Sequence, residues 1–254
     1  MIRVLLFLLL FFPGMLQAAG FGASNVTVFG ASSSTPESTA SKPRGERFIV
    51  VQAALKTGMP EIALAELKKM DEHDADYWLY MGQVQRQLRD PKAAAEAFTK
   101  VIKTDPDRAA GYDGLGMAYG DAGDPARGEA YLKKATELAP MEPTYYHDYG
   151  KLYLMQQRYA EARKPLAIAL RLGGGAEVAK HLAMAMTLTG DVEQAKTLLM
   201  QYFVLKEVYC NLGEAFELGG DIPEAVKYYR LALLADRDYK RAQERLANLI
   251  GGAS

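Results

Sequence analysis

The sequence contains very little cysteine, histidine or tryptophan: one cysteine, three histidines and one tryptophan among 254 residues. Because a disulfide needs two thiols, the single cysteine, Cys210, excludes an internal disulfide. It also excludes a zinc site built from several cysteines. We interpret Cys210 as a small, semi-buried apolar residue rather than a reactive thiol.

The motifs of common enzyme active sites are also missing. His73, His147 and His181 lie far apart in the sequence, and no two have the four-residue spacing with which histidines on one helix bind zinc. On a helix, the adjacent side chains of His147 and Asp148 would diverge by about 100° and form no catalytic pair. No G-x-S-x-G, phosphate-binding or dinucleotide-binding motif occurs. We therefore predict a protein that is not an enzyme and uses no cofactor or metal.

An excess of charge of one sign is absent as well. The sequence has 30 Lys and Arg residues against 31 Asp and Glu residues, which gives a formal net charge of −1. Such a balance supplies no general attraction to nucleic acid or to acidic membranes. The hydrophobic content of 49% is that of an ordinary globular protein.

Two segments at the start of the chain differ from the rest in composition. Residues 1–19 have a positive start at Arg3, an apolar run and small residues near the end, which is the pattern of a signal peptide. The run is shorter than the roughly 20 residues that span a bilayer, and no cysteine follows it to carry a lipid. Residues 20–43 are rich in Gly, Ser, Thr and Pro and are predicted to be a disordered tether. We expect an exported protein, periplasmic or outer-membrane-associated, without a membrane span in the mature chain; the alternative is a cytoplasmic protein behind a mis-assigned start codon.

From Arg44 onward the sequence repeats with a period of 34 residues. Three blocks follow one another without a gap, and in each an aromatic residue precedes a pair that ends in glycine, for example Tyr112 before Leu115-Gly116. A second apolar segment with helical spacing completes each block. The period shortens in one later block and then returns. The predicted units are 44–74, 75–108, 109–142, 143–176, 176–205 and 206–239, followed by one amphipathic capping helix at 240–250.

These spacings have physical causes. Apolar residues three and four apart form one face of a helix, and a glycine such as Gly116 lets the paired helix approach closely. Gly128 takes the place of an alanine in its block and is expected to soften its helix by roughly 1 kcal/mol. Pro165, inside a predicted helix, should kink or shift it. The run at 173–175 is expected to act as a flexible joint between the halves of the array.

At this point the sequence resembles the tetratricopeptide repeat family, over residues 44–239. The resemblance implies an all-α fold, a right-handed α-solenoid of about six helical hairpins with a C-terminal capping helix. Because one hairpin cannot bury its own apolar stripe, neighbouring hairpins stack to bury it.

The same resemblance implies a concave groove lined by the first helix of each unit, which binds a protein or peptide. Methionines on such a face offer adaptable apolar surface, and lysines or arginines can meet acidic groups. The lysine and asparagine network with which some relatives hold a chaperone carboxylate is not reproduced. The predicted groove residues are Leu79, Tyr80, Gln83, Arg86, Asp113, Met117, His147, Lys151, Met155, Lys180, Met184, Asn211 and Glu214.

A narrower resemblance is to TadD-type proteins of the bacterial tight-adherence (Flp) pilus machinery. It is carried by segments such as AKHLAMAMTLTGDVEQAKTLL and YCNLGEAFELGGDIPEA. It implies a non-catalytic scaffold of the bacterial envelope that helps to assemble a pilus or secretion machine, with pilus or secretin components as partners. The alternatives are another periplasmic helper, pilotin-like or cytochrome-maturation-like, and a peptide-binding regulatory module.

Overall fold

The computed structural model describes residues 48–251, which form thirteen α-helices and, within that range, no strand. The predicted signal peptide at 1–19 and tether at 20–43 lie outside the described residues. The first helices of the hairpins are α1 (Ile49–Lys56), α3 (Ala75–Gln87), α5 (Ala109–Asp121), α7 (Pro143–Met155), α9 (Gly175–Leu188) and α11 (Leu205–Leu218). The second helices are α2 (Pro60–Leu67), α4 (Pro91–Thr104), α6 (Pro125–Leu138), α8 (Tyr159–Arg171), α10 (Val192–Leu199) and α12 (Ile222–Ala235), and α13 (Lys240–Gly251) follows them.

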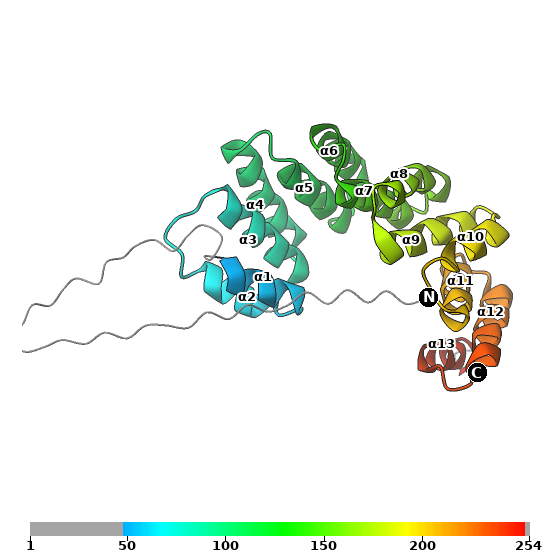
Figure 1. Cartoon of the computed structure of the whole chain (residues 1–254). Helices are drawn as coiled ribbons and strands as arrows, with labels where there is room; N and C mark the ends of the chain where they lie inside the picture. Colours follow the sequence, from blue (N-terminus) through cyan, green and yellow to red (C-terminus); the bar gives the residue numbers. More distant parts are fainter. Residues whose placement is uncertain (1–47, 252–254) are drawn as a thin grey trace, which may run out of the picture. The chain divides into compact units, whose positions relative to one another are not determined.

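The hairpins follow one another in chain order (Figure 1). Each first helix packs against its own second helix, and α3, α5, α7, α9 and α11 also contact the first helix of the next or previous hairpin. The apolar core is therefore a series of local clusters, for example Leu79, Phe98 and Leu115 between the second and third hairpins. The predicted all-α solenoid of helical hairpins is confirmed.

Glycines mark the closest crossings of the paired helices. A Cβ atom on Gly82 would lie 2.6 Å from the Phe98 ring, and one on Gly150 would lie 2.4 Å from Leu166 Cγ. In the third hairpin both sides of the crossing are glycines, because a Cβ atom on Gly128 would lie only 2.6 Å from the carbonyl oxygen of Gly116. Gly128 thus permits backbone contact between α5 and α6, beyond its expected effect on helix propensity.

Three of the six turns within the described hairpins pair a left-handed residue with an aspartate cap. Gly123 has φ +80°, and the Asp124 side chain accepts a hydrogen bond from the backbone N–H of Arg127. Two turns place a non-glycine residue in the left-handed region: Arg89, with φ 60°, and Gln157, with φ 58°. These positions carry backbone strain that a glycine would avoid.

Two of the local expectations concern Pro165 and the run at 173–175. Helix α8 runs unbroken through Pro165, which is buried within it. The run at 173–175 is an ordered turn in which Gly174 N–H donates to the Ala169 carbonyl at 3.0 Å. One apolar cluster continues across this turn, with Leu166 on one side and Val178 on the other. The packing therefore does not stop at the glycines, and the expected flexible joint is not what the structure shows.

Candidate protein-binding surface

The predicted groove residues lie on the first helices, and most keep part of their side chain accessible. The half-buried or exposed ones are Tyr80, Gln83, Arg86, Asp113, His147, Lys151, Met155, Lys180, Met184 and Glu214. Tyr80 is held within the first two hairpins, because its hydroxyl accepts a hydrogen bond from Gln52 and its ring packs 4.7 Å from the ring of Phe48.

Three predicted groove residues are instead buried, which corrects their assignment to an accessible surface. Met117 is 2% exposed and packs against Leu132 and Leu152, because the glycine crossing draws α5 and α6 together. Leu79 is 9% exposed and belongs to the core between hairpins. Asn211 is 5% exposed, and neither its amide oxygen nor its amide nitrogen makes a hydrogen bond.

At the N-terminal end of this surface, Arg86 and Gln87 line two adjoining hollows. One is bordered also by Leu55 and Gln83, and the other, of about 540 Å³, reaches Asp121 and Met155. Arg86 Nε donates to the Asp121 carboxylate at 2.8 Å, which joins α3 to α5 across one repeat. Met155 is 52% exposed, so it offers apolar surface beside a fixed ion pair.

In the middle of the surface, the structure brings together two histidines that the sequence analysis kept apart. His147 Nε2 and His181 Nδ1 lie 2.8 Å apart, within hydrogen-bonding distance, although 34 positions separate them. Burial lowers the pKa of His147, and burial followed by the charge of His147 lowers the pKa of His181 to about 4. Both imidazoles are therefore neutral at pH 7. The repeat length itself was the signal that would have predicted this pair.

Beside the histidines lies a pair of carboxyl groups from neighbouring repeats, Asp113 on α5 and Asp148 on α7. Lys151 donates to Asp148 at 2.9 Å, and the Asp148 side chain is 14% exposed. Burial is the main cause that raises the pKa of Asp113 well above its usual value, and the neighbouring Asp148 adds to the effect. The middle of the surface is thus polar, partly buried and rich in hydrogen-bonding groups.

At the C-terminal end, the capping helix already occupies part of the predicted surface. Arg241 donates to Glu214 through two nitrogens, one of them at 2.7 Å, and Arg245 makes a further ion pair with Glu217. Lys180 pairs with Glu177 on its own helix at 2.9 Å. Met184 and Leu218 remain at the edge of a hollow beside these ion pairs.

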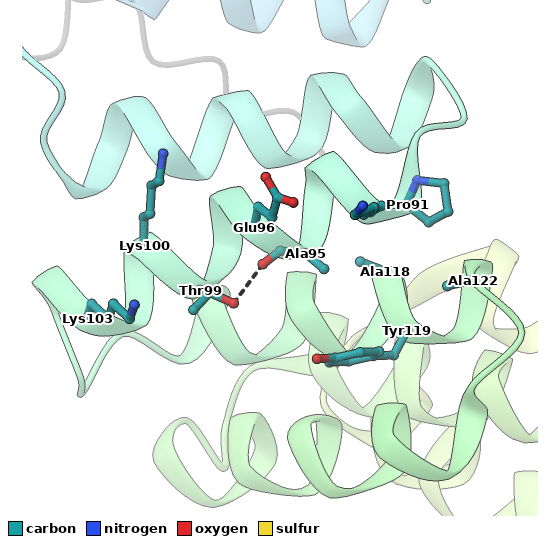
Figure 2. Close-up of a pocket in the computed structure, with 10 residues that line it drawn as sticks. Pro91, Ala95, Glu96, Thr99, Lys100, Lys103, Ala118, Tyr119 and Ala122 are labelled. Carbon is teal, nitrogen blue, oxygen red and sulfur yellow. Dashed lines mark hydrogen bonds between the residues drawn. The ribbon is translucent and has the colours of Figure 1, made fainter.

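Two further hollows use residues that the sequence analysis did not select. Figure 2 shows the first, which is lined by residues of α4 and α5, among them Thr99, Lys103 and Tyr119. The second, of about 580 Å³, lies along α7 and α8 and is lined by aromatic and apolar side chains, among them Tyr149 and Ile168. The sequence did not point to these two hollows, because only the first helix of each hairpin was expected to form binding surface.

Groups with the potential for chemistry are few in the described part of the chain. Cys210 is buried, and burial raises the pKa of its thiol to about 11, so it stays protonated at neutral pH. Residues 48–251 contain no group of three His, Cys, Asp or Glu side chains placed to hold a metal ion. No helix in the same range is both long and apolar enough to cross a bilayer.

Comparison with known proteins gives consistent matches to one repeat family. Models of the tetratricopeptide repeat match residues 51–109, 114–177 and 206–239. A segment of 125 residues, 49% of this chain, is 28% identical to the Protein O-mannosyl-transferase Tmtc1 of Drosophila melanogaster. The match covers only 14% of that protein, so its transferase name does not extend to this chain.

Solved structures agree on the fold. A crystal structure of MamA protein is 25% identical, with TM-score 0.50, and the match covers 66% of this chain and 95% of MamA. A structure of Pseudomonas aeruginosa pilF is 19% identical, with TM-score 0.57, over 81% of this chain and 97% of pilF. This repeat fold typically serves as a non-catalytic scaffold for interactions between proteins. With family matches over more than half of its length and stacked helical hairpins throughout the described residues, the chain belongs to the tetratricopeptide repeat family.

Proposed function

We propose that this protein binds a partner polypeptide along the surface formed by α3, α5, α7, α9 and α11. The observation that carries the proposal is the row of hollows on these helices. Side chains that the core does not use line them, namely Gln83, Arg86 and Met155 at one end and Met184 and Leu218 at the other. Concave sites with mixed apolar and polar walls are where ligands usually bind.

The proposed cellular role is that of an accessory factor in the bacterial envelope, for assembly of a pilus or secretion machine of the tight-adherence type. Support for export comes from the signal-like composition of residues 1–19. Support for the pilus role comes from the resemblance of the later repeats to TadD-type proteins. Export and the pilus role describe where the protein acts. The binding surface can be tested independently of both.

The test of the binding surface is cross-linking in the envelope, followed by affinity recovery of the protein and mass spectrometry of what is bound. Met155→Glu places a charge on exposed apolar surface beside Arg86. Leu234→Glu is the matched control, because Leu234 is 80% exposed on α12, away from the first helices. We expect Met155→Glu to lower partner recovery at least about tenfold, which corresponds to roughly 1.4 kcal/mol.

The control should recover the partner as well as the parent does, and circular dichroism should show both variants folded. Equal recovery by Met155→Glu and the parent would refute the binding surface. Met117→Glu is unsuitable for this test, because a buried charge at a 2%-exposed position should unfold the third hairpin. Fractionation of cells tests the location: protein found only in the cytoplasm would refute the envelope role.

A further inference from the structure

Two histidines in the middle of the binding surface bring two ring nitrogens together at an accessible place. His147 is on α7 and His181 is on α9, and His147 Nε2 lies 2.8 Å from His181 Nδ1. The ring centres are 4.9 Å apart, so these two nitrogens face one another. Both side chains are only partly buried, and that of His181 is 19% exposed. Water and small ions can therefore reach the pair.

In the free protein the two facing nitrogens share one hydrogen. Their lowered pKa values leave both imidazoles neutral at pH 7, so one nitrogen of the pair donates and the other accepts. A neutral imidazole binds a metal ion through one ring nitrogen while its proton is on the other. A metal ion can therefore replace the shared hydrogen by a change of tautomer, without a net loss of protons.

The separation of the two nitrogens indicates which ions fit. With bonds of about 2.0 Å, two nitrogens at a right angle lie about 2.8 Å apart, whereas a tetrahedral angle places them about 3.3 Å apart. The observed 2.8 Å matches the right angle. Right angles are typical of square-planar and tetragonal Cu²⁺ and Ni²⁺ sites, and imidazole is a preferred ligand of both ions.

A carboxylate beside the pair supports the tautomer that a metal ion needs. Glu177 Oε1 lies 3.8 Å from His181 Nε2, the ring nitrogen that does not face His147. A negative charge in this place favours a proton on Nε2, which leaves Nδ1 free to bind the ion. Metal-binding histidines in proteins are commonly oriented by a carboxylate in the same way.

The remaining charges near the pair balance one another. Lys151 and Lys180 would repel a cation, but Lys151 pairs with Asp148 and Lys180 pairs with Glu177, each at 2.9 Å. Within residues 48–251 no set of three His, Cys, Asp or Glu side chains is placed to hold a metal ion. The chain thus supplies two ligands, and water completes the coordination.

We propose that His147 and His181 form a two-histidine site for Cu²⁺ or Ni²⁺ that links α7 to α9 across one repeat. The site goes beyond the proposed function, because this chain binds the ion without a partner polypeptide. Spacing along one helix could not reveal it, since the two histidines are 34 positions apart and meet only through stacking. A bound ion joins neighbouring hairpins and should therefore stabilise the folded protein.

The test titrates Ni²⁺ into the whole protein, without a histidine tag, by isothermal titration calorimetry at pH 7.5. Mg²⁺, which prefers oxygen ligands, is the control ion. His147→Gln and His181→Gln each remove one ligand, and His73→Gln is the matched control because His73 is exposed and precedes α3. We expect one Ni²⁺ per parent chain and binding at least about tenfold weaker in each test variant. His73→Gln should bind Ni²⁺ like the parent, and Mg²⁺ should not bind.

Two further measurements connect the ion to these two rings. Electron paramagnetic resonance of the Cu²⁺-loaded parent should show coupling to two imidazole nitrogens. Ni²⁺ at about 100 times its dissociation constant should raise the melting temperature of the parent by about 5–10 °C. His147→Gln should gain less. Circular dichroism shows whether each variant is folded, and if one is not, the other variant and the resonance spectrum of the parent decide.

Several results would overturn the proposal. They are the absence of Ni²⁺ binding in the parent, parent-like affinity in a folded His147→Gln or His181→Gln variant, and equal weakening by His73→Gln. Cu²⁺ coupled to fewer than two imidazole nitrogens in the parent would overturn it as well. Failure of the proposed function is distinguishable, because it is read from partner recovery by Met155→Glu, whereas metal binding is measured without a partner.

Discussion

Replacement of Gly128 by alanine tests how the third hairpin is packed. Two effects of opposite sign compete. Alanine is a better helix former than glycine by about 1 kcal/mol, so helix propensity alone predicts a more stable protein. The new methyl group, however, would lie 2.6 Å from the Gly116 carbonyl oxygen and 3.3 Å from Leu152 Cδ2.

The packing effect should exceed the propensity effect. A side chain such as Leu152 can rotate away, but the Gly116 oxygen belongs to the backbone of α5 and moves only with the helix. Extra atoms in a well-packed core cost about 1–3 kcal/mol, and we expect about 2–3 kcal/mol here because the clash is with backbone. The expected net change is therefore a loss of about 1–2 kcal/mol in the free energy of unfolding, or roughly 2–8 °C in melting temperature for a chain of this size.

The assay is urea and thermal denaturation followed by circular dichroism at 222 nm. Ala130→Gly is the control for propensity, because Ala130 is exposed in the middle of the same helix, α6, and should lose about 1 kcal/mol without any clash. If Gly128→Ala proves as stable as the parent or more stable, the close approach of α5 and α6 at this crossing is refuted.

Three other variants have expected outcomes. Because the folded pKa of His181 is lowered to about 4, the unfolded chain binds its proton first, so stability is complete above about pH 6.5 and falls as the pH drops towards 4. His181→Gln should reduce this acid-induced loss of stability by up to about 3 kcal/mol, measured as the difference between melts at pH 7 and pH 4.5. An unchanged loss would show that His181 does not cause it. Gln157→Gly should stabilise the protein by about 1 kcal/mol through relief of positive φ; a lower melting temperature would count against strain there. Asn211→Leu should stabilise it by about 1 kcal/mol, since the buried amide has no hydrogen bond; destabilisation would mean that the amide has a partner.

Much of the fold followed from the sequence because its causes are local. Gly82 and Gly150 could be assigned to helix crossings from their position in the period. In the structure each lies so close to a side chain of the paired helix that a larger residue would clash. The sequence predicted a flexible joint at the 173–175 run, but whether glycines form a joint depends on the packing on both sides of them. In the structure, Leu166 and Val178 belong to one apolar cluster that continues across this run.

The binding surface depended more on tertiary structure. Met117 and Met155 both belong to first helices and looked equivalent, yet one is 2% and the other 52% exposed. The difference arises because the Gly116–Gly128 contact draws α5 and α6 together over Met117, and helical periodicity alone does not reveal how closely two helices approach.

The sequence by itself determined the helical period, the position of the hairpins and the absence of common catalytic motifs, since each depends on residues near one another in the chain. Only the tertiary structure decided which side chains meet across repeats. His147 with His181 and Arg86 with Asp121 are separated by 34 and 35 positions, close to one repeat length. The period allows such meetings, but the stacking of α3, α5, α7 and α9 selects them.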